Sequence, residues 1–215
     1  MTNERMFIKD KIAAGEYLDW LNAFTSVMKG KGEGVVPCGD CVACCTSSKF
    51  VHLRPSDTKA IAKIPKELLF KAPGLPEGHY LLGYNEKGHC PMFGESGCTI
   101  YHDRPETCRQ YDCRALAALG SKVEEGSADI GRRAAKWEFT FSNPESVEHF
   151  EAVKLARSFL IENKELFPAR FVPELGPPLA ILVLRIHGEF LGRSSLSLKK
   201  NRDQIIKHLI ATYKV

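Results

Sequence analysis

The most distinctive feature of the sequence is a set of cysteines confined to one part of the chain. All of them lie between residues 38 and 113, with none in the 37 residues before or the 102 residues after. Thiolate sulfur is a soft ligand for zinc and for iron–sulfur clusters, so this clustering predicts a metal site. The predicted ligands are Cys38, Cys41, Cys44, Cys45, Cys90, Cys98, Cys108 and Cys113.

Disulfide bonding is the first alternative for such a chain. Secreted proteins use disulfides where the hydrophobic core is too small, but 215 residues are enough to bury a core without them. The adjacent Cys44 and Cys45 cannot pair without a strained ring. Burial as small hydrophobic side chains explains one or two cysteines but not this spacing. Metal binding or catalysis therefore accounts best for the clustered thiols.

The first cysteine run has a spacing suited to coordination. Cys38, Cys41 and Cys44 repeat the first three positions of the bacterial ferredoxin run. Ser48 occupies the fourth ferredoxin position, so the choice between zinc and an iron–sulfur cluster stays open. Because adjacent side chains diverge, Cys44 and Cys45 predict either two separate sites or one ligand beside a packed thiol.

The second part of the pattern is Cys90-Pro91 followed by the segment from Cys98 to Arg109, which reads Cys-x-Ile-Tyr-x-x-Arg-Pro-x-x-Cys-Arg. Together with the Cys-x-x-Cys-x-x-Cys-Cys run, this segment resembles the CxxCxxCC cysteine-cluster family, described as zinc- or iron-chelating. The resemblance spans residues 38–113, about a third of the chain. It implies that all eight cysteines are directed at metal. Related segments in flagellin lysine methylases imply an iron–sulfur centre as a further lead.

Periodicity and turn signals predict an α+β fold that is mainly helical. In this fold a compact cysteine-rich module, with short β-hairpins held by metal, is flanked by helices. We divide the chain into an N-terminal helix with a flexible approach (1–37), the metal-binding module (38–113) and a helical C-terminal region packed on the module (114–215).

Individual elements follow from the same signals. A hairpin about Asn85-Glu86 is expected to join residues 80–84 to residues 87–92. A turn at 95–97 is expected to bring Cys98 back toward Cys90. The other expected elements are a strand at 50–53 and helices at 13–29, 55–64, 128–138, 145–163 (with Pro144 at its start) and 203–213, with a short helix beginning at Pro105. Residues 179–187 are consistent with a buried helix or a strand, and we favour the helix.

Charge and hydropathy limit the classes of partner. The formal charge is +4, but two zinc ions bound by eight thiolates would bring the total close to zero. The basic stretch at 193–207 contains Asp203 and apolar residues, which predicts the solvated face of an amphipathic helix rather than a nucleic-acid site. The N-terminus lacks the apolar core of a signal peptide, and the apolar run at 179–184 is too short to cross a bilayer. We therefore expect a cytoplasmic protein with neither a nucleic-acid nor a membrane partner.

Two functional hypotheses remain. In the first, zinc or an iron–sulfur cluster in a closed site organises a fold that binds an unidentified protein or small molecule. In the second, the chain is a metalloenzyme or redox component, linked to protein modification, with an open metal position. The first is slightly favoured because no constellation of acid, base and nucleophile is visible; whether the chain is an enzyme stays open. His89 and His102 are expected beside the ligands, since eight thiolates are available.

Overall fold

The structure, a computed structural model, describes residues 11–32, 34–120, 128–174 and 176–213. About 48% of it is helix and 11% is strand, which confirms the mainly helical α+β class. The chain forms two compact units, and the three-part division expected from the sequence stays a prediction. Unit 1 comprises Met1–Thr25, Cys113–Gly126 and Gly131–Val215, and unit 2 comprises Ser26–Asp112 and Ser127–Ile130.

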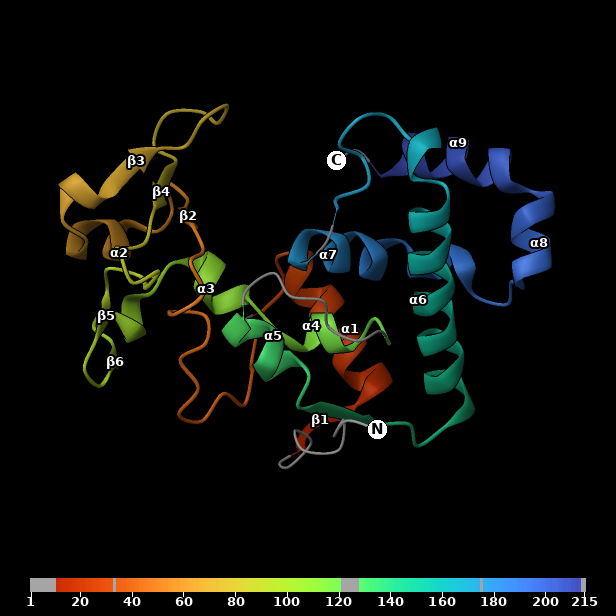
Figure 1. Ribbon diagram of the computed structural model, residues 1–215, viewed down its shortest axis with the longest axis horizontal. Helices are drawn as coiled ribbons and strands as arrows, with labels where there is room; N and C mark the ends of the chain where they lie inside the picture. The colour runs from red at the N-terminus through yellow and green to blue at the C-terminus, as the bar shows by residue number, and fades with distance from the viewer. Residues whose placement is uncertain (1–10, 33, 121–127, 175, 214–215) are drawn as a thin grey trace, which may run out of the picture. The chain divides into compact units, whose positions relative to one another are not determined.

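Unit 2 is built around a small antiparallel sheet (Figure 1, orange to yellow-green). Strand β4 (Tyr80–Leu82) lies in the centre, between β2 (Val51–Leu53) and β3 (Leu69–Lys71). Leu82 faces Val51 on one side and Leu69 on the other. Both edges of β4 are therefore already hydrogen-bonded to other strands.

This sheet makes the predicted hairpin between residues 80–84 and 87–92 wrong. Strand β4 pairs with β2 and β3, so residues 87–92 have no edge of it to bind. A turn does form at Asn85 as predicted, but it closes only a tight loop between residues 85 and 89. In that loop the Asn85 N–H donates to the His89 carbonyl at 2.8 Å, and the Gly88 N–H donates to the Asn85 carbonyl at 2.8 Å.

The turn expected at 95–97 lies in a short hairpin of unit 2. Strands β5 (Phe93–Gly94) and β6 (Gly97–Cys98) pair antiparallel, with Phe93 opposite Cys98. The Phe93 N–H donates to the Cys90 carbonyl at 2.9 Å, so the chain returns toward Cys90 as expected. Two short helices complete this unit, α2 (Thr58–Lys63) and α3 (Glu106–Gln110).

The core of unit 2 lies beneath the sheet and the hairpin. Cys90 and Cys98 pack against this core, which places two of the predicted ligands on an apolar base. Burial of such side chains stabilises the unit by about 25 cal/mol for each square ångström of apolar surface. The buried members are Leu53, Ala60, Ile64, Leu82 and Ile100.

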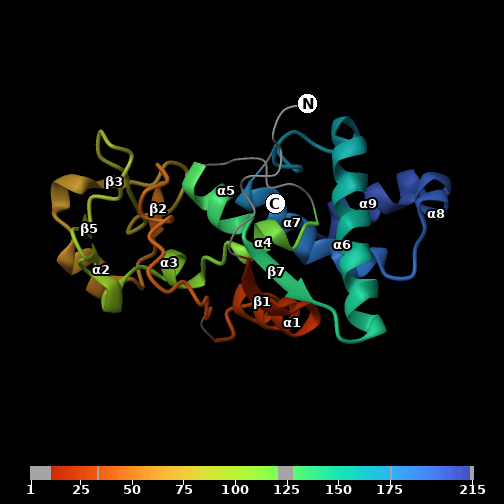
Figure 2. The same ribbon diagram turned by 60° about the horizontal axis from the view of Figure 1, so that its bottom comes forward.

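Unit 1 contains a pair of strands that the sequence did not indicate. Strand β1 (Ile12–Glu16) runs parallel to β7 (Trp137–Thr140), and Figure 2 shows the two side by side. Parallel strands need a crossover connection, and here more than a hundred residues separate the two. Short-range sequence patterns carry no trace of such a pairing.

The helices of unit 1 agree with most of the predicted ranges. Helix α6 begins as predicted at Pro144, and the Asn143 side chain caps it by accepting the Ser146 N–H at 2.8 Å. Helix α8 was not predicted. The helices that lie wholly in this unit are α4 (Arg114–Ala117), α6 (Pro144–Glu162), α7 (Pro177–Ile186), α8 (Ser195–Lys200) and α9 (Arg202–Thr212), and α1 (Tyr17–Met28) and α5 (Ala128–Ala134) have residues in both units.

Aromatic and aliphatic side chains form the core of unit 1. The Tyr17 ring is fully buried, and its hydroxyl donates to the Ala118 carbonyl at 3.1 Å. Burial raises the pKa of this phenol, so it stays neutral. On α9, Ile205 and Leu209 are buried, which confirms the amphipathic helix. No helix among the described residues is long and apolar enough to span a membrane.

A half-buried histidine in unit 1 makes stability depend on pH. The His187 Nδ1 lies 2.7 Å from the Leu184 carbonyl and its Nε2 lies 3.1 Å from His149 Nδ1. Burial, aided by His149, lowers the pKa of His187 below its usual value, although the bond to Leu184 opposes this. Near pH 6.5, His187 therefore binds a proton in the unfolded chain but stays neutral in the folded chain.

Stability should accordingly fall as the pH drops through about 6.5, because the unfolded state then binds more protons. Thermal unfolding between about pH 7.5 and 5.5 should show this loss, and His187→Gln should reduce it. The exposed His208 provides the control variant, His208→Gln. An identical pH dependence in the wild type and in His187→Gln would contradict the prediction.

Candidate metal centre

The first cysteine run, at 38–45, forms consecutive turns in unit 2. The Cys41 N–H donates to the Cys38 carbonyl at 3.1 Å, and the Cys45 N–H donates to the Val42 carbonyl at 2.8 Å. Gly39 has a φ of +55°, a left-handed conformation that glycine adopts without strain. The run therefore changes direction at each cysteine pair, as short Cys-x-x-Cys spacing requires.

A backbone hydrogen bond joins this run to the second cysteine stretch. The Cys90 N–H donates to the Cys45 carbonyl at 2.7 Å, although the two residues are 45 positions apart. The β5–β6 hairpin then places Cys98 beside Cys90. Helix α3 supplies Cys108, as predicted from Pro105. Two parts of the chain that are distant in sequence and carry cysteines thus lie side by side in unit 2.

The thiols lie close enough to influence one another's protonation. Burial is the main cause that raises the pKa of Cys45 to about 11, followed by Cys90, Cys98 and Cys41. Burial likewise raises the pKa of Cys108 to about 12, with Cys90, Cys45 and Cys98 adding to it. The pKa of Cys90 is also raised, by burial and then by Cys98. These five sulfurs constitute the thiol cluster.

Cys108 differs from the other members of the thiol cluster in its exposure. Cys108 as a whole residue is exposed to solvent. Its sulfur nevertheless has many protein atoms around it, so desolvation is the largest cause of its raised pKa. The nearby Arg104 opposes this by lowering the pKa of Cys108. The Arg104 guanidinium lies 4.1 Å from the centre of the Tyr101 ring and donates to the Tyr101 carbonyl at 2.8 Å. The positively charged Arg104 guanidinium is therefore held in place close to Cys108.

The donor set of the thiol cluster fits a soft metal ion. Sulfur ligands select zinc or iron–sulfur clusters over hard cations such as Mg²⁺. Among the described residues, however, no three Cys, His, Asp or Glu side chains converge closely enough to hold an ion. The sulfurs are neighbours without forming a closed coordination sphere. A bound cation would supply the charge needed to ionise these thiols and draw them together.

The remaining three predicted ligands lie in different surroundings. Cys38 is half-buried at the start of the first turn, and Cys44 is exposed. Cys113 belongs to unit 1, where it is buried and accepts a hydrogen bond from the Trp137 indole at 3.1 Å. That all eight cysteines bind metal stays a prediction.

The histidines near the cysteines have other contacts. The His89 ring packs edge-on against Phe93, and the His102 ring packs against Tyr101. Sequence reasoning missed a third arrangement, in which His52 Nε2 lies 2.9 Å from His79 Nδ1. No motif spacing links these two residues, because it is the pairing of β2 with β4 that brings them together.

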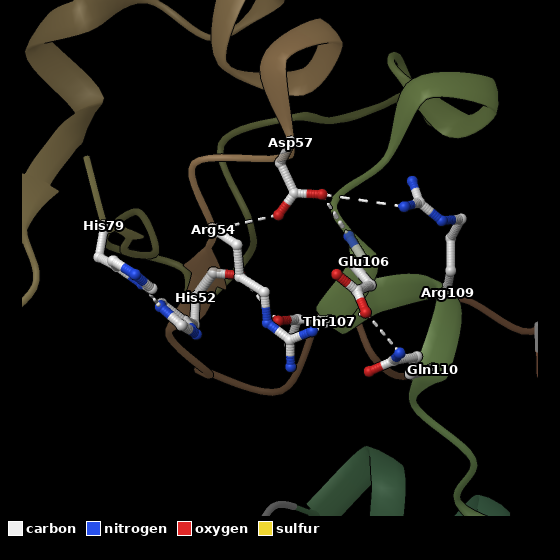
Figure 3. Close-up of polar contacts among 8 residues, drawn as sticks. All are labelled: His52, Arg54, Asp57, His79, Glu106, Thr107, Arg109 and Gln110. Carbon is white, nitrogen blue, oxygen red and sulfur yellow. Dashed lines mark hydrogen bonds and ion pairs between the residues drawn. The ribbon is translucent and has the colours of Figure 1, made fainter. Parts of the chain in front are cut away.

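A buried carboxylate beside α3, the helix that carries Cys108, was also missed. Figure 3 shows Asp57 between the end of β2 and the start of α3. Its Oδ2 accepts the Arg54 N–H at 2.9 Å, and its Oδ1 accepts the Glu106 N–H at 2.7 Å. The sequence indicated Asp57 only as part of a helix start. Its partner at Glu106 is 49 residues away, beyond the reach of local patterns.

Fold and site together define a cysteine-cluster domain within a larger α+β chain. Residues 37–131 match the family model CxxCxxCC, described as a putative zinc- or iron-chelating domain. This match confirms the resemblance over residues 37–131 and supports metal binding in general terms. No curated protein and no solved structure matches the chain.

The adjacent Cys44 and Cys45 allow a direct test of the site's electrostatics. Thiolates react with iodoacetamide and neutral thiols do not. In reduced, chelator-treated protein at pH 7, the exposed Cys44 should therefore be alkylated at least about tenfold faster than the half-buried Cys45. Tandem mass spectrometry resolves the two positions. Equal rates, or a faster Cys45, would contradict the placement of Cys45 in a crowded cluster of neutral thiols.

Proposed function

We propose that the chain is a metal-binding protein that coordinates zinc or an iron–sulfur cluster through the thiol cluster. The carrying observation is that thiols from distant parts of unit 2 lie together: the Cys90 N–H donates to the Cys45 carbonyl at 2.7 Å, and Cys90, Cys45 and Cys98 add to the raised pKa of Cys108. Buried neighbouring thiols are costly to ionise unless a cation compensates them. A metal with four thiolate ligands supplies that compensation.

The role that we propose for the metal is structural. Unit 2 has a small core and short strands, so coordination would add substantially to its stability, because metal binding is coupled to folding. Cys41, Cys45, Cys90, Cys98 and Cys108 are the main ligand candidates. The organised unit would then bind a protein or small-molecule partner.

Substitution of Cys90 tests the proposal. Cys90→Ser should lower the apparent metal affinity by more than the roughly 10–100-fold that losing a supporting group costs, because a ligand itself is removed. The full-length chain should be purified without oxygen, and its zinc, iron and acid-labile sulfide measured. Iron with equimolar sulfide would identify an iron–sulfur cluster, and zinc without sulfide would identify a zinc site.

The matched control is Ser96→Ala, in the exposed turn of the β5–β6 hairpin. It changes the same hairpin without touching a thiol, so its metal content should equal that of the wild type. A wild-type protein that binds neither zinc nor iron would overturn the proposed function. A Cys90→Ser variant that retains full metal content would remove Cys90 from the ligand set.

The exposure of Cys108 favours a second candidate, a metalloenzyme or redox component with an open metal position. A ligand at the surface is the one that a substrate or water could reach or replace. Added thiocyanate or azide would alter the electronic spectrum of the cobalt-substituted protein in that case. A closed site with four thiolates would leave the spectrum unchanged.

A further inference from the structure

The helix that carries Cys108 lacks a cap within its own sequence. Helix α3 begins at Glu106, and its N-cap residue, Pro105, makes no side-chain hydrogen bond. The first N–H groups of any helix have no partner within the helix and need an acceptor. Here the acceptor comes from a distant residue, because Asp57 Oδ1 accepts the Glu106 N–H at 2.7 Å (Figure 3).

Asp57 is itself held firmly in place. Only 1% of its side chain is exposed, and its second oxygen accepts the Arg54 N–H at 2.9 Å. The Arg109 guanidinium lies 3.9 Å from Oδ1 and compensates the buried charge. A buried carboxylate with bonds on both oxygens has little freedom to move, so the start of α3 is fixed relative to β2 and α2.

A second bond anchors the same turn of α3 to the sheet. The Thr107 hydroxyl donates to the carbonyl of His52, in β2, at 2.7 Å. Cys108 is the next residue along the chain. One bond to Asp57, at the start of α2, and one bond to β2 therefore set both the position and the rotation of the turn that presents the Cys108 sulfur.

Side-chain contacts of Glu106 also surround the start of α3. Arg54 makes an ion pair with Glu106 at 2.6 Å, and the Gln110 amide donates to the same carboxylate at 2.6 Å. These contacts join side chains near the surface, where ion pairs contribute little. The buried hydrogen bonds of Asp57 are therefore the dominant constraint on the helix.

We propose that Asp57 is a positioning residue for the metal centre, which holds helix α3 so that the Cys108 sulfur lies in the thiol cluster. The proposal rests on the proposed function. Metal sites lose affinity steeply when a ligand's supporting contacts are removed, commonly by about 10–100-fold. Asp57 gives that support through the backbone of the ligand's own helix rather than through the sulfur.

The test compares Asp57→Ala with the matched control Asp103→Asn in the full-length protein. Asp103 lies in the same unit, makes an ion pair with Lys63 at the surface and is five residues from Cys108. Its substitution removes the same charge without freeing the start of α3. Zinc affinity is measured by competition with a chromophoric chelator. Asp57→Ala should bind zinc at least about tenfold more weakly, and Asp103→Asn should match the wild type.

Amide hydrogen exchange supplies a readout independent of metal. In the metal-free protein, the Glu106 N–H should exchange faster in Asp57→Ala than in the wild type, because it has lost its acceptor. Asp57→Asn keeps one acceptor oxygen and should show a smaller loss of zinc affinity. If Asp57→Ala does not fold, Asp57→Asn decides the question by the same measurement.

The outcomes separate this inference from the proposed function. If the wild type binds zinc and Asp57→Ala binds it equally well, the positioning role is overturned and the proposed function stands. An equal loss in Asp103→Asn would assign the effect to charge and would also overturn it. If neither Asp57 variant folds, Asp57 is a residue of the fold and the inference fails. A wild type that binds no metal overturns both.

Discussion

Neighbouring sulfur atoms that burial keeps neutral are the constraint on which unit 2 depends. The Cys90 N–H bond to the Cys45 carbonyl joins the two cysteine stretches, and burial followed by Cys90, Cys98 and Cys41 raises the pKa of Cys45. Such a group is stable either as neutral thiols or as thiolates around a cation. The two states differ in charge and in sulfur separation, so the local fold and the metal content of this unit are one equilibrium.

Three other features of unit 2 influence the equilibrium between neutral thiols and metal-bound thiolates. The apolar core beneath the sheet carries Cys90 and Cys98. The buried Asp57 fixes the helix that bears Cys108. Arg104 provides a positive charge that lowers the pKa of Cys108 and so favours its ionised form. Each element contributes something different, namely a rigid base, an orientation and an electrostatic bias, and Asp57 lies outside the cysteine motifs.

The sequence predicted those parts of the structure that depend on local signals. Pro144 marked the start of α6, and the turn expected at 95–97 is present between β5 and β6. Local signals failed where pairing is distant. The hairpin expected between residues 80–84 and 87–92 is wrong because β2 and β3 occupy both edges of β4, which no turn residue reveals. The bond between Asp57 and Glu106 was missed for the same reason. The thiols were identifiable from spacing alone, but their grouping required the fold.

The most direct test of the account is X-ray absorption spectroscopy of the metal in protein isolated without oxygen. The method counts the atoms bound to the ion and identifies their element. The account predicts a shell of about four sulfur atoms near 2.3 Å for zinc, or sulfur and neighbouring iron for a cluster. A shell made only of oxygen or nitrogen would contradict it, because the metal would then be bound away from the thiols.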